Sequence, residues 1–198
     1  AIFRPSIGLW AIKHVTRLYY GRGEDIPVPA DYDGDGICDP AVFRPDTGLW
    51  AIRNISRAYF GGGEDFPVSG DYNWDGAAEI GIFRSSNGLW AVRGYSRFYY
   101  GASGDRPVPA EYQIYAARNH SYKWRTKLAV FRPSVGLWAV RGYTRVYFGR
   151  SGDLPLKGDF DGDSLAEIGV FRSSSGLWAI RGLTRAYYGR TGDLPVTR

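Results

Sequence analysis

Acidic residues recur at fixed spacing in three short segments of the chain. The clearest is DYDGDGICD at 31–39, which places carboxylates at its first, third, fifth and ninth positions. Carboxylate oxygens are hard ligands that suit Ca²⁺, and a loop of this length can direct them toward one point. The sequence therefore predicts about three structural Ca²⁺ ions, one in each loop. The predicted ligands are Asp31, Asp33, Asp35 and Asp39 in the first loop, Asp71, Asn73, Asp75 and Glu79 in the second, and Asp159, Asp161, Asp163 and Glu167 in the third.

A second interpretation of these loops is that the acids form Asx turns and bind no ion. Four acids within nine residues would then repel one another without a neutralising cation. An EF-hand is a poor fit, because the last acid falls at position 9 of the loop and the flanking segments have the pattern of strands. Metal-binding loops between strands are therefore preferred.

The acidic loops belong to a longer repeat. The pattern F-R-x-x-x-G-L-W-A-(I/V) begins at residues 3, 43, 83, 131 and 171, so successive copies are 40, 40, 48 and 40 residues apart. A fixed period of this size, filled with short β-branched and aromatic runs between Gly, Pro and Asp, is typical of β-propellers. In the second repeat we expect strands at 28–32, 40–44, 49–53 and 56–61, with turns at 45–48 and at Asn54-Ile55.

The predicted fold is all-β: a five-bladed β-propeller of four-stranded antiparallel blades, forming a single domain over residues 1–198. The chain begins at a second strand (1–4) and ends after a first strand (194–198). The C-terminal strand is therefore expected to complete the N-terminal blade and close the ring, with an open solenoid as the alternative. Without a long apolar run or a signal-like start, the chain is expected to be soluble, and the lack of Met suggests a processed chain or a piece of a longer one.

The loop followed by AVFRP, then GLW, and later by YFG and GD-x-P, resembles the FG-GAP (VCBS-like) calcium-binding propeller repeats. Such repeats occur in integrin α-subunit propellers, in a fungal integrin-like lectin and in many secreted or surface-anchored bacterial proteins. The resemblance covers essentially the whole chain and implies structural Ca²⁺, an extracellular location and a role in adhesion or recognition. Two features depart from the family: the repeat is shorter than in most members, and five blades instead of seven is unusual.

The fourth loop differs from the other three. Glu111 and Gln113 stand at its first two acidic positions, and it carries an 8-residue insertion within 111–130, so no metal is expected there. The insertion is rich in aromatic and basic residues, and a long loop on a rigid scaffold is a common place for binding. Tyr122, Trp124 and Arg125 are therefore candidate ligand-binding residues. The alternative is that the aromatic side chains pack in place of the metal.

Tryptophan and arginine also recur in register. The tryptophans are expected in the core, because the LWA(I/V) strands are apolar on both faces; contact with a sugar ligand is the alternative. The arginines after Phe are expected to pair with aspartates of the G-x-D and GED turns between blades, and a ring of unpaired arginines that binds an anionic glycan or nucleic acid is the alternative. The single cysteine, Cys38, is expected to be a small packed residue. The recurring residues are Trp10, Trp50, Trp90, Trp138 and Trp178, then Arg4, Arg44, Arg84, Arg132 and Arg172, and then Asp25, Asp65, Asp105, Asp153 and Asp193.

Catalysis is not expected. Glycosidases need two carboxylates that flank a central site, but all 20 Asp and Glu residues are accounted for by the four loops, the turns before the first strands and one hairpin turn. The sequence also offers no plausible Ser or Cys triad and no phosphate-binding Gly loop that leads into a helix. The chain is therefore predicted to be no enzyme.

The charge of the chain favours acidic partners. The net charge is +5, and three bound Ca²⁺ ions would add about six positive charges. We expect an extracellular, secreted or cell-surface recognition module, lectin-like (carbohydrate-binding) or adhesive, whose partner is a carbohydrate or another cell-surface or envelope component. The alternative is a structural building block or capping domain of a larger surface assembly, with protein partners and no small ligand. No nucleic-acid motif accompanies the arginines, and N-x-S sequons begin at Asn54 and Asn119.

Overall fold

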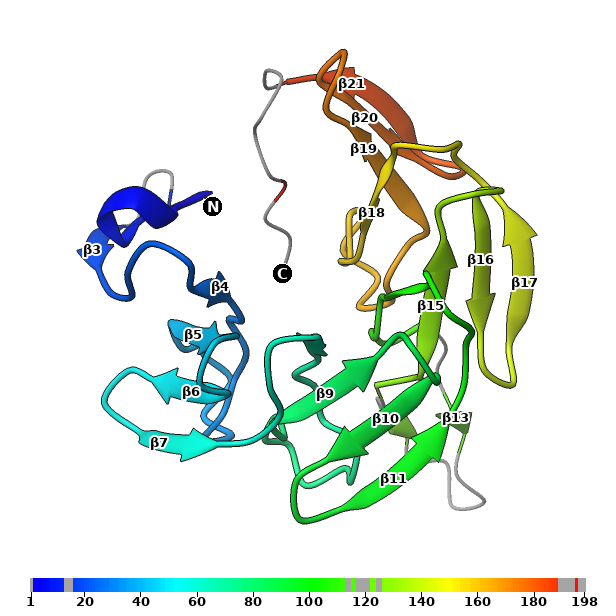
Figure 1. Ribbon diagram of the computed structural model, residues 1–198. Helices are drawn as coiled ribbons and strands as arrows, with labels where there is room; N and C mark the ends of the chain where they lie inside the picture. Colours follow the sequence, from blue (N-terminus) through cyan, green and yellow to red (C-terminus); the bar gives the residue numbers. More distant parts are fainter. Residues whose placement is uncertain are drawn as a thin grey trace. The chain divides into compact units, whose positions relative to one another are not determined.

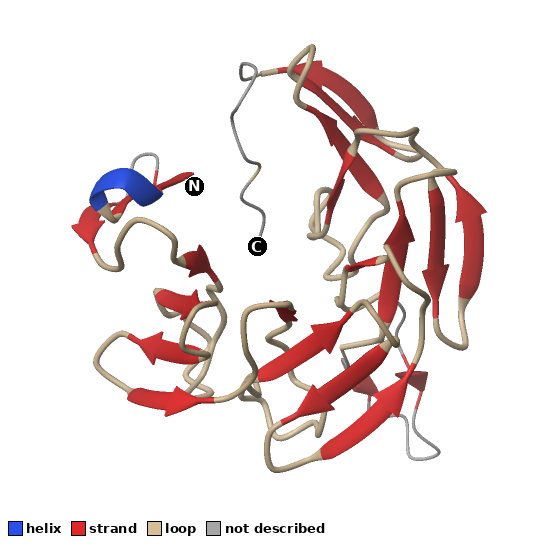
Figure 2. Cartoon of the chain, in the orientation of Figure 1, coloured by secondary structure: helices blue, strands red, loops and turns tan. Residues whose placement is uncertain are grey.

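The computed structural model of the chain describes residues 2–12, 16–112, 115–116, 122–123, 126–188 and 195. Strands joined by turns and loops make up this part of the chain, together with one short helical turn, η1 (Pro5–Ile7) (Figures 1 and 2). None of its helices has the length and apolar character needed to cross a membrane. The chain divides into two compact units, Ala1–Arg84 with Leu89–Tyr99, and Ser85–Gly88 with Tyr100–Arg198.

The first unit contains three antiparallel blades. Their strands pair in chain order, with the acidic loops of the second and third blades between the first two strands. The blades are β1 (Ile2–Arg4), β2 (Leu9–Ile12) and β3 (Thr16–Tyr19); β4 (Ile26–Pro27), β5 (Ala41–Arg44), β6 (Leu49–Ile52) and β7 (Ser56–Tyr59); and β8 (Asp65–Pro67), β9 (Gly81–Arg84), β10 (Leu89–Val92) and β11 (Ser96–Tyr99).

The second unit contains two further four-stranded antiparallel blades and a small hairpin. The hairpin lies within the insertion and pairs Tyr115 with Lys123. The strands are β12 (Arg106–Pro107), β15 (Ala129–Arg132), β16 (Leu137–Val140) and β17 (Thr144–Tyr147); β18 (Leu154–Leu156), β19 (Gly169–Arg172), β20 (Leu177–Ile180) and β21 (Thr184–Tyr187); and, in the hairpin, β13 (Tyr115–Ala116) and β14 (Tyr122–Lys123).

These sheets confirm the predicted fold class, an all-β, five-bladed β-propeller. Four blades have four strands, and the first has three within the described chain. The strand expected to complete it, at 194–198, lies outside the described residues except for Pro195. Closure of the ring by that strand and a single domain over 1–198 therefore stay predictions.

The second, third and fourth strands of each blade form close to their predicted positions, but the first strand lies earlier. In the second blade it is Ile26–Pro27, and residues 28–32 pair only through the bridge between Ala30 and Asp39. Val28 still donates its N–H to the Ala41 carbonyl at 2.9 Å. The predicted tight turn is confirmed, with φ of 62° at Asn54.

Three of the repeated tryptophans, Trp10, Trp50 and Trp138, pack against the next blade of the same unit. In the first unit Trp50 is fully buried, packs on Phe43 with 5.2 Å between ring centroids, and clusters with Ile82 and Ala91 of the next blade. Its indole N–H donates to the Phe60 carbonyl at 3.0 Å. The prediction of a core role is confirmed for Trp10, Trp50, Trp90 and Trp138. Trp178, in the last blade of the chain, is only partly buried.

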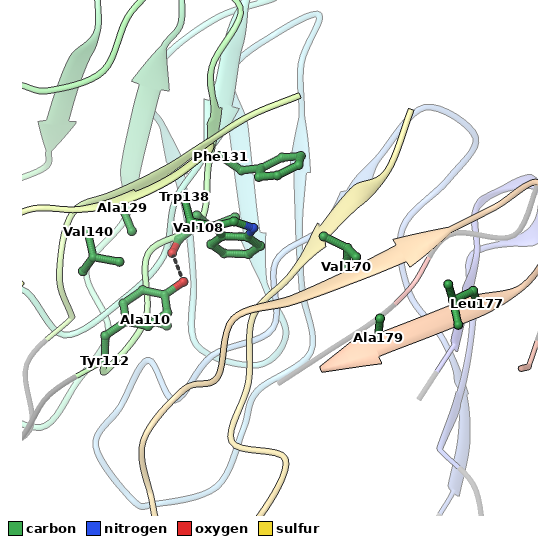
Figure 3. Close-up of a cluster of buried hydrophobic side chains, with 10 residues drawn as sticks. All are labelled: Val108, Ala110, Tyr112, Ala129, Phe131, Trp138, Val140, Val170, Leu177 and Ala179. Atoms are coloured by element: carbon green, nitrogen blue, oxygen red, sulfur yellow. Dashed lines mark hydrogen bonds between the residues drawn. The ribbon is translucent and has the colours of Figure 1, made fainter. Parts of the chain in front are cut away.

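The second unit repeats this packing. Figure 3 shows Phe131 and Trp138 of one blade directed toward Val170 and Ala179 on β19 and β20 of the next. Tyr112 belongs to the same cluster and donates its phenol hydrogen to the Val108 carbonyl at 2.7 Å (Figure 3). Burial raises the pKa of this phenol well above its usual range, so Tyr112 is a neutral core residue and not part of a binding surface.

Replacing Tyr112 with Phe is expected to destabilise the fold by about 1–3 kcal/mol, because the buried Val108 carbonyl loses its donor. A urea unfolding curve measures the change. Tyr147→Phe is the matched control: its side chain is exposed, so the same loss of a hydroxyl should leave stability unchanged. Equal stability of Tyr112→Phe and the parent protein would contradict the structural role of this bond.

Candidate metal-binding loops

Three acidic loops bring carboxylates together. In each loop the ligand atoms of three carboxylates lie within 4.8 Å of one another. Ca²⁺ holds oxygen ligands at about 2.3–2.6 Å, so oxygens on opposite sides of one ion are about 5 Å apart. The carboxylate groups therefore fit a single cation of this size. The three groups are Asp31, Asp33 and Asp39; Asp71, Asp75 and Glu79; and Asp159, Asp161 and Glu167.

Backbone N–H groups of each loop hold its first and last acids. Asp31 accepts from Gly34 at 2.7 Å and from Gly36 at 2.8 Å, and Asp39 accepts from Tyr32 at 2.9 Å. The first two bonds require the loop to double back, which Gly34 and Gly36 permit with φ of 79° and 82°. The glycines and acids of the motif thus act together: the glycines shape the loop, and its N–H groups aim the carboxylates.

The same bonds recur in the other two loops. The first acid accepts from the third and fifth residues after it, and the last acid accepts from the second residue of the loop. The acceptors are Asp71 and Glu79 in the second loop, and Asp159 and Glu167 in the third.

Three of the twelve predicted ligands lie outside these carboxylate groups. Asp35 accepts the Ile37 N–H at 2.7 Å, and Asp163 accepts the Leu165 N–H at 2.8 Å. Asn73 donates its side-chain amide to Asp75 at 2.9 Å. Coordination of an ion by these three residues stays a prediction.

The last acid of each loop has a raised pKa. Burial is the largest cause for Asp39, Glu79 and Glu167, and the negative charges of neighbouring loop acids add to it. Asp75 shows the opposite, since a hydrogen bond from the Ala77 N–H lowers its pKa. A bound cation would offset the repulsion felt by the last acids, because it supplies the opposite charge.

In the fourth loop a lysine stands at the position of the last acid. The isolated bridges pair Ala30 with Asp39 and Gly70 with Glu79, and the equivalent bridge pairs Ala110 with Lys127. Lys127 is 6% exposed, and nearby Thr126 donates to Glu111 at 2.7 Å. The equivalence of this lysine to the last acids was not predicted. Aligning the strand after the insertion, KLAVFR, with EIGIFR and EIGVFR would have revealed it.

The insertion leaves the ligand-binding prediction open. Tyr122 lies on β14, but its side chain and the residues Trp124 and Arg125 are outside the described part of the structure. Tyr112, just before the insertion, is equivalent to the buried Tyr72 of the third blade. Both tyrosine phenols bond to a valine carbonyl four residues earlier.

The loops also join neighbouring blades. In the first unit, Ala78 donates its N–H to the carbonyl of Asp31 at 2.7 Å, so the third blade bonds to the first acid of the loop before it. In the second unit, Ala166 bonds to the Glu111 carbonyl at 2.8 Å. An ion held by Asp31 would therefore stabilise a contact between blades as well as its own loop.

The recurring ion pairs lie within blades, not between them as expected. Arg44, at the end of β5, binds Asp25, just before β4, with Nε–Oδ1 at 2.8 Å and Nη2–Oδ2 at 3.0 Å. These strands are neighbours in one sheet, in which Ile26 pairs with Phe43. The other described pairs repeat the geometry: Arg84–Asp65, Arg132–Asp105 and Arg172–Asp153.

The expectation for Cys38 was wrong as well. Its side chain is exposed in the first acidic loop and forms no disulfide. The loop curls outward to direct its acids, and its residues from Asp33 to Cys38 are all exposed.

Comparison of the chain with protein-family models, with curated proteins and with solved structures finds no match. The class of the protein is thus defined by its structure alone: it is a five-bladed β-propeller with three acidic clusters that could hold metal ions.

Proposed function

We propose that the chain is a calcium-stabilised propeller of the FG-GAP (VCBS-like) type that works outside the cell as a non-catalytic, carbohydrate-binding recognition module. The observation that carries the proposal is the set of three carboxylate clusters, each at the same place between the first and second strands of a blade. Their shared position supports one common role, that of a structural ion site.

The donor set favours Ca²⁺ over other metals. Each cluster offers carboxylate oxygens and no His or Cys, which is the chemistry of hard cations. Mg²⁺ demands a nearly ideal octahedron at shorter distance, whereas Ca²⁺ accepts irregular oxygen cages. The residues that would hold the ions are Asp31, Asp33 and Asp39 and their equivalents. The bound ion would supply positive charge that neutralises the loop.

Lys127 supports the need for positive charge at these positions. The fourth loop, which keeps Glu111 but has lost the other acids of the motif, carries a buried lysine where the other loops carry Asp39, Glu79 or Glu167. Burying an ammonium group is costly unless negative or polar groups surround it. The ammonium group of Lys127 would thus supply in the fourth loop the positive charge that a bound metal ion would supply in the other three.

Recognition of an acidic partner follows from the charge balance. The chain carries 25 basic and 20 acidic residues, and the acids are concentrated in the loops and in the ion pairs. Loading the loops with Ca²⁺ would neutralise them and leave the exposed arginines to set the character of the surface. An acidic glycan of a cell surface or envelope is the partner that fits.

The test is a glycan array probed with the calcium-loaded chain. The expected result is binding to a subset of glycans, with acidic ones preferred and neutral ones weak. The chain refolded without Ca²⁺ is the control. Absence of binding to every glycan, with self-association of the loaded protein, would overturn the carbohydrate-binding role and favour a building block of a larger assembly.

A further inference from the structure

An exposed tyrosine ends the outermost strand of every blade. These five side chains are 72–75% exposed, although each belongs to a regular sheet. The residue before each tyrosine varies among Leu, Ala, Phe and Val, whereas the tyrosine itself does not. The exposed set is Tyr19, Tyr59, Tyr99, Tyr147 and Tyr187.

An arginine lies two residues before each tyrosine, on the same face of the strand. In the third blade, Arg97 pairs with Ala91 and Tyr99 pairs with Leu89 across the sheet. Side chains two residues apart on a strand point the same way, and both are exposed here. Within the described chain, the ion pairs use the arginines of the second strands and leave this second set without a carboxylate partner.

A second arginine continues the row that begins at the tyrosine. Leu89 pairs with Tyr99 on one side and with Arg84 on the other, so Tyr99, Leu89 and Arg84 occupy one line across the sheet. Asp65 holds the Arg84 guanidinium by two hydrogen bonds of 2.8 and 2.9 Å, and 41% of the arginine side chain stays exposed. The guanidinium is thus held at its Nε–Nη2 edge by Asp65, while part of the arginine side chain stays exposed.

The tyrosine and this second arginine lie on the same face of the sheet, two strands apart, and both pair with one leucine, which is Leu137 in the fourth blade. The pKa of Arg132 is raised, mainly by its hydrogen bond to Asp105 and in smaller part by the Tyr147 phenol. Arg172 and Tyr187 show the same coupling in the last blade. Each of these blades thus presents one flat aromatic ring and one fixed, planar cation on the same face of the sheet.

We propose that this tyrosine and the two arginines of each blade form a repeated binding site for the uronic acid units of an acidic polysaccharide. The aromatic ring offers an apolar face to the C–H groups of a sugar, and a phenol that hydrogen-bonds its hydroxyls. A guanidinium matches a carboxylate with two parallel hydrogen bonds. The proposal rests on the carbohydrate-binding role proposed above and names its site and ligand.

The repetition of the site suits a polymer. One ring and two guanidinium groups bind a single sugar weakly, but linked sites on one chain raise the overall affinity without new contacts. Among the four blades in which Asp holds the second arginine, that arginine is most exposed in the third and the fourth, at 41% and 38%. The tyrosines of these two blades, Tyr99 and Tyr147, should therefore contribute most.

The experiment measures binding of the calcium-loaded chain to labelled hyaluronan, a polymer with one glucuronate in each disaccharide. The double variant Tyr99→Ala, Tyr147→Ala should bind at least tenfold more weakly than the parent chain. The double variant Tyr95→Ala, Tyr143→Ala is the matched control, since it removes two exposed tyrosines from the hairpin turns of the same blades. It should bind as the parent chain does. Methyl esterification of the polymer should also weaken binding at least tenfold.

Unchanged affinity of the Tyr99, Tyr147 variant, with its melting curve intact, would overturn the site. If hyaluronan binding were then lost on changing Trp124, the carbohydrate-binding role would stand and this inference would fail alone. Tighter binding to single-stranded DNA than to hyaluronan at the same ionic strength would overturn the ligand class. Absence of all glycan binding would remove the proposed function together with the site.

Discussion

Chelation of the calcium-loaded chain is expected to lower its melting temperature by about 20 °C. An ion that binds only the folded state at 100 times its Kd stabilises that state by about 2.7 kcal/mol, and three such ions together by about 8 kcal/mol. For a chain of this size each kcal/mol corresponds to about 2–4 °C. Thermal melts followed by circular dichroism in excess Ca²⁺ and in excess chelator measure the shift.

Metal counting and loop variants define the source of this effect. Dialysed protein should retain about three Ca²⁺ ions per chain, one for each carboxylate cluster. Changing Asp71 to Ala should remove one ion and about a third of the shift. Glu111→Ala is the matched control from the fourth loop, where the described residues form no cluster, and it should leave the metal count unchanged. A melting temperature that is the same with Ca²⁺ and with chelator would disprove the calcium assignment.

The strands and turns of the blade could be predicted because their signals are local. Asn54 takes a positive φ at the turn that is Gly94, Gly142 or Gly182 in other repeats, and the LWA(I/V) strands form between their predicted neighbours. The acidic loops are local too, since their acids bond to N–H groups within a few residues. The spacing of the acids in the sequence was therefore enough to predict that their carboxylates come together.

The ion pairs were misplaced because the first strand was predicted two residues too late. In the predicted blade Asp25 therefore lay outside the sheet. Its position next to Arg44, 19 residues later in the chain, was not expected. The exposed tyrosines were overlooked for a different reason. Tyrosine is favoured in strands whether buried or exposed, so its type alone does not show which face it occupies. Only the pairing of Tyr99 with Leu89, and the exposure of the tyrosine in the structure, reveal this.

Replacing Arg132 with Met is expected to destabilise the chain by about 3 kcal/mol, which would lower the melting temperature by about 6–12 °C. The Asp105 carboxylate is fully buried and receives two bonds from the guanidinium, Nε–Oδ1 at 2.7 Å and Nη2–Oδ2 at 3.0 Å. It also accepts the N–H of Ala102, so it fixes the segment that leads into β12. Without the arginine, a buried charge loses its partner. The arginine itself is partly exposed, which places the effect at the lower end of the range for buried pairs.

The double variant Arg132→Met, Asp105→Asn distinguishes loss of the pair from loss of packing. It removes both charges while the asparagine oxygen can still accept the Ala102 N–H, so it should be more stable than Arg132→Met alone. Arg150→Met is the matched control, since that side chain is exposed and forms none of the described ion pairs; its stability should stay within about 0.5 kcal/mol of the parent. Chemical denaturation of these proteins, together with Asp105→Asn alone, completes the double-mutant cycle and gives the coupling energy. If Arg132→Met unfolds at the same denaturant concentration as the parent, the pair contributes nothing to stability and the recurrence of Arg and Asp in every blade needs another cause. If the predicted loss is found, the same bidentate pair can be assigned the same role in the second, third and last blades, where the distances repeat to within 0.1 Å.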